Sequence, residues 1–165
     1  MRNIMTIALA ATALVSAVAN AATATTTFAV TATVLKTCSA TANPLAFGSY
    51  TPGSGAVAGT TTVSIKCTNG TPYTVALNGG STTSGTIAQR LMANGTNTLQ
   101  YNLYTTSGFG TIWGDGTTGS TQVGTGLGVA TANTLTVYGQ LPDSATNQSA
   151  VTGSYTDTVT VTVTY

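Results

Sequence analysis

The chain has 165 residues, and only 4% of them are charged: four Lys or Arg, three Asp, and no His or Glu. This composition excludes a His-based catalytic triad and a His-containing zinc site, and two cysteines cannot form a four-thiolate site. Arg2 would be lost with an N-terminal signal, and the remaining three scattered cations cannot form a nucleic-acid-binding patch. The sequence therefore predicts no enzyme, no bound metal or cofactor, and no nucleic-acid partner. The near-zero net charge predicts poor solubility as a free monomer, which favours an assembled protein.

Residues 1–21 have the pattern of a cleaved secretory signal. Arg2 gives a short positive start, residues 4–18 are almost wholly apolar, and Ala19-Asn20-Ala21 fits the small-x-small cleavage rule. The apolar run is shorter than the roughly 20 residues that a spanning helix needs. We expect cleavage after Ala21, with Ala19 as the alternative, and a mature chain without a membrane span.

Export makes the two cysteines interpretable. Cys38 and Cys67 are the only cysteines in the chain, and an even count in an oxidising compartment indicates a disulfide. A catalytic thiol would need a His partner or a CxxC spacing, and the sequence has neither.

The mature chain is rich in Thr, Val, Gly and Asn, which favours short strands separated by turns. Many such runs are typical of an all-β sandwich. We expect no helix after the signal, with residues 88–93 forming at most one helical turn. The expected strands, in chain order, are residues 25–35, 45–47, 60–66, 73–77, 99–105, 121–129, 134–141 and 155–165.

The first and last of these strands alternate most clearly. One face of the last strand carries Tyr155, Val159, Val161, Val163 and Tyr165, while Thr occupies the other face. One face of the first strand carries Phe28, Val30, Ala32 and Val34. Uncharged, Pro-free strands of this kind invite pairing with another chain. Either both ends pair within one sandwich, or the N-terminal strand is meant for the sheet edge of a neighbouring subunit.

A set of short motifs occurs in order along the mature chain. They are FAVTATV (28–34) followed by Cys38, LAFGSY (45–50), VSIKCT (63–68), YNLY (101–104), IWGDG (112–116), YG (138–139) and GSYTD (153–157). In this ordered set the chain resembles the spore coat protein U domain family, the secreted pilus subunits of archaic, Csu-type chaperone–usher pili.

The resemblance implies an incomplete immunoglobulin-like β-sandwich that lacks its last strand and is completed by a donor strand. It implies three parts: a cleaved signal (1–21), an N-terminal donor strand (22–36) and a pilin domain (37–165). The Cys38–Cys67 disulfide would tie the start of that domain to a following strand. The side chains implied to fill the groove of another subunit are Phe28, Val30, Ala32 and Val34. The implied acceptor edge carries Tyr155, Val159, Val161, Val163 and Tyr165.

The implied partners are a periplasmic chaperone, which first lends a strand, an outer-membrane usher, which exchanges it, and further copies of the pilin, which form a homopolymer. Such a subunit passes through the periplasm to the cell surface, where the pilus supports attachment and biofilm formation. A single domain with its own N-terminal strand favours a shaft or minor subunit over a tip adhesin.

Two other functions remain open from the sequence. The chain could be a self-complemented carbohydrate-binding module, with Trp113 as a stacking platform and Asp115 as an acceptor; the more ordinary interpretation places Trp113 in the core beside a tight turn. It could also be a structural protein of a coat layer, without any pilus.

Overall fold

The computed structural model describes residues 21–165, so the predicted signal, apart from Ala21, lies outside the described residues. Residues 21–37 contain no strand or helix, and the strand predicted for residues 25–35 is not formed in the single chain. A strand needs a partner to satisfy its backbone N–H and C=O groups. Residues 34–165 form a unit of their own, and the description below concerns that unit.

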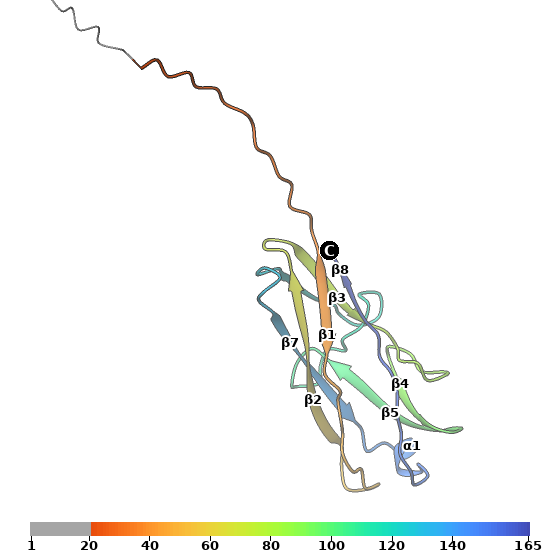
Figure 1. The fold of residues 1–165 in the computed structure, drawn as a ribbon. Coiled ribbons are helices and arrows are strands. Elements are labelled where there is room, and N and C mark those ends of the chain that lie inside the picture. Colours follow the sequence, from red (N-terminus) through yellow and green to blue (C-terminus); the bar gives the residue numbers. More distant parts are fainter. Residues whose placement is uncertain (1–20) are drawn as a thin grey trace, which may run out of the picture. The chain divides into compact units, whose positions relative to one another are not determined.

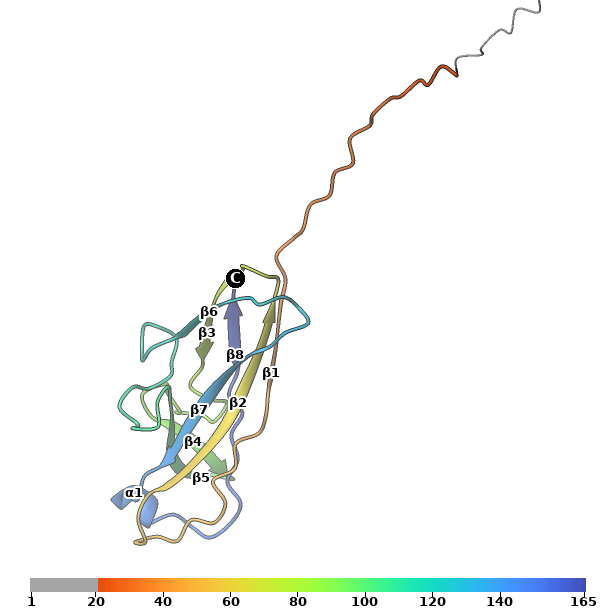
Figure 2. The ribbon, with the colours of Figure 1, turned by 90° about the vertical axis from the view of Figure 1, so that its left-hand side faces the viewer.

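Two antiparallel sheets make up this unit (Figure 1). The larger sheet has the strand order β1 (Cys38–Ala42), β2 (Val57–Cys67), β7 (Asn133–Leu141), β5 (Asn97–Tyr104) and β4 (Arg90–Asn94). The smaller sheet has the order β6 (Gln122–Thr125), β3 (Pro72–Leu77) and β8 (Val161–Thr164). A short helix, α1 (Ala145–Gln148), follows β7. The fold is an all-β, immunoglobulin-like sandwich, as predicted; Figure 2 shows the long strands β2 and β7 side by side.

Side chains from both sheets meet in one apolar core. β2 contributes Val63 and Ile65, and β3 contributes Tyr73, Val75 and Leu77, all at most 4% exposed. The buried members from the rest of the chain are Cys67, Tyr101, Leu103, Trp113 and Val137. The odd-numbered residues of β3 alternate with more exposed ones, which is the period-2 pattern of a strand with one buried face.

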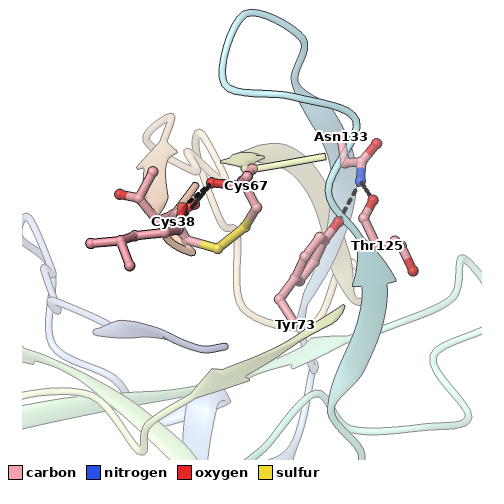
Figure 3. The surroundings of a disulfide bond; sticks show 8 residues. Cys38, Cys67, Tyr73, Thr125 and Asn133 are labelled. Atoms are coloured by element: carbon pink, nitrogen blue, oxygen red, sulfur yellow. Dashed lines mark hydrogen bonds between the residues drawn. A yellow bond between two sulfur atoms is a disulfide. The ribbon is translucent and has the colours of Figure 1, made fainter. Parts of the chain in front are cut away.

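The predicted disulfide between Cys38 and Cys67 is present and joins the first strand to the second (Figure 3). The two cysteines are paired in register in the ladder of β1 and β2. Close to it, Asn133 on β7 donates to the Tyr73 hydroxyl at 2.8 Å and to the Thr125 carbonyl at 2.7 Å. These bonds link the larger sheet to the smaller one at the end where β1 begins.

Several predicted elements differ from the structure. Residues 88–93 were expected to form at most a helical turn, but residues 90–93 belong to β4, which joins β5 through the two-residue turn Gly95-Thr96. Residues 45–47 form no strand, although they pack on the sheet. The helix α1 was not expected; its N-cap Ser144 accepts a hydrogen bond from the Asn147 amide. β1 was missed because its residues after Cys38 are small and exposed, so they show no apolar alternation.

Candidate functional site

The site lies between the two unpaired edges of the sandwich. β1 is the outermost strand at one side of the larger sheet, and β8 is the outermost strand of the smaller sheet. Each therefore has one edge without a strand partner in the described part of the chain. The two strands approach each other near the C-terminus (Figure 1). Beyond this meeting point, residues 43–50 and residues 155–159 line hollows over the core.

Two connected cavities make up these hollows, and together they form the groove. The inner cavity, of about 370 Å³, lies next to the meeting point of β1 and β8 and is lined by Ala42, Val161 and the core residues Val63, Leu77 and Val137. The outer cavity, of about 730 Å³, is lined by residues 45–50 and by residues 150–155, which directly follow α1. The residues that line both are Leu45, Phe47, Met92 and Tyr155. We call the end of the outer cavity beside residues 150–155 the mouth of the groove.

One wall of the groove, residues 45–47, packs against a pair of glycines on the larger sheet. Gly59 on β2 and Gly139 on β7 are register partners. A Cβ added to Gly139 would lie 2.8 Å from the Leu45 side chain and 3.0 Å from the Phe47 ring. The missing side chain therefore lets residues 45–47 lie directly on the sheet. Phe47 in turn contacts Tyr101 edge to face, with ring centroids 5.9 Å apart.

The opposite wall is the C-terminal segment, residues 155–161. Its odd-numbered residues are half-buried and its even-numbered residues are exposed, as the sequence alternation predicted. The even-numbered residues bond toward the sandwich, because Asn78 donates its backbone N–H to the Thr160 carbonyl at 3.2 Å and Thr156 exchanges two backbone bonds with Ala93. Hydrogen-bonding direction alternates along a strand. The backbone groups of Asp157 and Val159 therefore point to the open edge.

Only residues 161–164 of the predicted strand 155–165 form a regular ladder, because side chains replace the partner strand before them. Asn78 Oδ1 accepts from the Thr160 amide at 2.8 Å, and Ser81 Oγ accepts from the Thr158 amide at 3.2 Å. The turn at residues 78–82 thus holds residues 158–160 of this wall without a continuous sheet.

Asp157 joins that turn to the floor of the groove. Its Oδ1 accepts from the amide and hydroxyl of both Ser81 and Thr82 at 2.9–3.1 Å. Its Oδ2 accepts from the Tyr101 hydroxyl at 2.6 Å. Burial alone would raise the pKa of Asp157, but the hydrogen bonds outweigh it and the pKa is lowered. Burial and the bond to Asp157 raise the pKa of Tyr101. The carboxylate is therefore a structural anchor beside the apolar floor of the groove.

A second carboxylate holds the wall at the mouth. Asp143 accepts from the Tyr50 hydroxyl and from the amides of Gly53 and Gly55 at 3.0 and 2.8 Å. The Tyr50 hydroxyl is the largest of the influences that lower the pKa of Asp143 to about 2. Desolvation, followed by this bond, raises the pKa of Tyr50 to about 12. The bonds fix the loop at residues 50–55, next to α1.

Arg90 supports the floor beneath the groove and was not singled out from the sequence. Its guanidinium is fully buried and donates to the Asn102 side chain at 2.6 Å and to the carbonyls of Asn78 and Trp113 at 2.9 and 2.8 Å. A lone Arg carries no sequence signal of burial. Every buried side-chain nitrogen and oxygen in the described residues has a hydrogen-bond partner.

The residues predicted for the two strand surfaces are placed differently. Tyr155, Val159 and Val161 line the groove, Val163 packs against the core beyond its inner end, and Tyr165 is 54% exposed. The predicted donor side chains Phe28, Val30 and Val34 are 83–85% exposed, and Ala32 is exposed as well.

The carbohydrate-binding alternative is wrong in its key residue. Trp113 is fully buried in the core, and its Nε1 donates to the Val75 carbonyl at 3.0 Å. A buried indole offers no face for a sugar to stack on. Asp115 is occupied in its own turn, where Oδ1 accepts from the amides of Thr117 and Thr118 at 2.9 and 2.8 Å.

The described residues hold no group of three or more His, Cys, Asp or Glu side chains that could bind a metal ion. No helix within residues 21–165 is long and apolar enough to cross a membrane.

Comparison with known proteins identifies relatives of this fold. The family model described as Spore Coat Protein U domain matches residues 24–162. Among solved structures, the chain is similar to one chain of the CsuC–CsuE chaperone–tip adhesion subunit pre-assembly complex from archaic chaperone–usher Csu pili of Acinetobacter baumannii. The identity is 27% and the TM-score 0.53, over 81% of this chain and 40% of that one, so this chain spans less than half of its structural relative. No curated protein matches the sequence.

Proposed function

The chain belongs to the Spore Coat Protein U domain family, and on this premise we propose that it is a structural, non-enzymatic subunit of a chaperone–usher pilus that polymerises by donor-strand exchange. Residues 25–35 of one copy would fill the groove of the next copy. A periplasmic chaperone would cover the groove before assembly, and an outer-membrane usher would exchange the chaperone for the next subunit. The finished fibre would stand on the cell surface and support attachment and biofilm formation.

The observation that carries this proposal is the match between the groove and the N-terminal segment. The groove has an apolar floor and an open backbone edge along residues 155–161. Residues 25–35 carry no charge and no proline, and four apolar side chains lie on one face. A strand added at such an edge makes main-chain hydrogen bonds and buries alternate side chains. Burial of Phe28, Val30 and Val34 contributes roughly 1.5–3 kcal/mol each before ordering costs.

The arrangement of the ends favours a fibre. The start of β1 lies at the same end of the unit as the C-terminus, while α1, beside the groove mouth, lies at the other end (Figures 1 and 2). A donor strand that leads into β1 of one subunit and enters the mouth of another joins unlike ends. Such a heterologous contact does not close on itself, so it propagates.

The apolar lining of the groove also gives a reason for a chaperone. Exposed apolar surface promotes aggregation, and the chain carries only three Asp and four Lys or Arg to oppose it. The structural relative is itself a chaperone–subunit complex by its description.

Peptide complementation tests the proposal. A chain that begins at residue 37 is mixed with a peptide of residues 25–35, and its thermal unfolding midpoint is measured. The expected result is a rise in the midpoint that grows with peptide concentration. A peptide with Val30→Asp is the matched control, because a buried unpaired charge should abolish the effect. Equal shifts with both peptides, or none with either, would contradict the donor assignment.

A further inference from the structure

Resting on the proposed function, we infer that Asp157 and Tyr101 form a pair in the groove that admits only a small donor side chain and so sets the register of the donor strand. In this register Ala32 of the donor lies opposite Asp157. Phe28 then lies opposite Val161, Val30 opposite Val159, and Val34 opposite Tyr155.

The direction of the donor follows from the short connection to the domain. Only residues 35–37 separate Val34 from Cys38 at the start of β1, and four residue steps span at most about 14 Å. Val34 must therefore lie at the groove mouth, where the donating subunit stands. The wall strand runs from Tyr155 at the mouth to Val161 at the inner end. The donor is thus antiparallel to it, as are all strand pairs in the described residues.

The parity of the pairing follows from the hydrogen bonds. Odd-numbered wall residues direct their backbone groups to the open edge, because the even-numbered ones bond inward at Thr156 and Thr160. The same odd-numbered side chains are the half-buried ones that face the core. The even-numbered donor side chains must face the core beside them, so each register pairs an even donor residue with an odd wall residue.

The groove offers four such wall positions, and Asp157 differs from the other three. Tyr155, Val159 and Val161 are uncharged, whereas the Asp157 carboxylate is bonded to the Tyr101 hydroxyl at 2.6 Å and to the turn at residues 81–82. The turn holds the carboxylate in place, and a Cβ on Gly80 would overlap its Oδ2. A rigid, already satisfied polar pair leaves room only for a small apolar neighbour. Among the four donor side chains the smallest is Ala32.

Shifting the donor by two residues is unfavourable in either direction. One shift places the charged Lys36 opposite Tyr155 inside the groove and moves Phe28 to Val163, which lies beyond the lined cavity. The other shift places Thr26 opposite Val161, in the apolar inner cavity, and Val30 against Asp157. The inferred register leaves Lys36 in the mouth, opposite Gly153, and Thr26 beyond the inner end, opposite Val163.

Cysteine cross-linking in the full mature chain tests the register. In the inferred register Thr31 and Thr158 face each other on the outer surface as a non-hydrogen-bonded pair, about 4.5 Å apart at Cα, which suits a disulfide. A Thr31→Cys/Thr158→Cys variant should therefore give covalent ladders on non-reducing denaturing gels that collapse on reduction. The matched controls are Thr33→Cys/Thr158→Cys and Ala29→Cys/Thr158→Cys, whose pairs are diagonal and about 7–8 Å apart. They should cross-link only weakly.

The outcomes separate this inference from the proposed function. Ladders chiefly in a control variant would overturn the register and leave donor-strand exchange standing. Fibres in all variants without covalent ladders in any would also overturn the register. The absence of fibres from every variant and from the unmodified chain would overturn the proposed function itself.

A second measurement tests the preference for a small donor side chain beside Asp157. Ala32→Leu should lower the yield of fibres roughly tenfold or more, because extra methylenes in a packed site are costly. The matched variant Val30→Leu, away from Asp157, should change the yield less than about twofold. The reverse order of sensitivity would overturn the role of Asp157 and Tyr101.

Discussion

Removal of the Cys38–Cys67 disulfide should lower the free energy of unfolding by about 3.6 kcal/mol. The bond closes a loop between residues 29 positions apart, and the chain-entropy relation gives that magnitude for a loop of this length. The folded state should change little, because β1 remains paired with β2 over its whole length. The loss therefore arises mainly from greater freedom of the unfolded chain.

Urea unfolding of a chain that begins at residue 34 measures this loss without strand exchange between copies. Trp113 is the only tryptophan and is fully buried, so its fluorescence reports unfolding. The Cys38→Ala/Cys67→Ala variant should unfold at a urea concentration lower by roughly 1–4 M, depending on the slope. Thr41→Ala, an exposed change in the same strand, is the control and should stay within about 0.5 kcal/mol. A loss below about 1 kcal/mol for the double variant would refute the reasoning.

Three further predictions concern the groove walls. Gly80→Ala should destabilise the chain more than Gly70→Ala in denaturant unfolding. Both glycines have positive φ, so an alanine costs roughly 1–2 kcal/mol of backbone strain at either position, but only the Cβ at residue 80 would also overlap Asp157. Equal losses of stability would contradict the overlap. Asp157→Asn should make the free energy of unfolding depend less on pH in acid. The lowered pKa of Asp157 stabilises the folded chain at pH values above the ordinary pKa near 3.9, and that stability is lost as the pH falls through the lowered pKa. An unchanged loss of stability in acid would count against Asp157 as an anchor. Tyr50→Phe should remove one phenol that ionises near pH 12 from an ultraviolet absorbance titration, because desolvation and the bond to Asp143 raise the pKa of Tyr50 to about 12. The stability linked to protonated Tyr50 is present below pH 10 and is lost as the pH rises through about 12. An unaltered titration curve would exclude the assignment to Tyr50.

Part of this architecture could be predicted from the residues because it depends on local periodicity. The alternation of Tyr155, Val159 and Val161 with Thr predicted a wall with one buried face, and the structure has that pattern. The disulfide followed from export and an even count of cysteines. These signals need no knowledge of distant partners.

The remainder depends on contacts between distant segments. The motifs at residues 45–50 and 138–139 were visible in the sequence. Their contact was not, in which Gly139 lets Leu45 and Phe47 lie on the sheet. Arg90 is buried because its guanidinium finds carbonyl partners outside its own hairpin, at Asn78 and Trp113. The ladder before Val161 is broken because Asn78 and Ser81 side chains replace a strand, and no local pattern indicates that substitution.

The central claim, that residues 25–35 join one subunit to the next, is tested most directly by the oligomeric state of the purified mature protein. Size-exclusion chromatography with light scattering would compare the mature chain with the same chain lacking residues 22–35. The account predicts fibres or detergent-resistant ladders from the mature chain and none from the truncated one. A mature chain that is a stable monomer, and that unfolds when residues 22–35 are removed, would contradict it, because the strand would then complete its own sandwich.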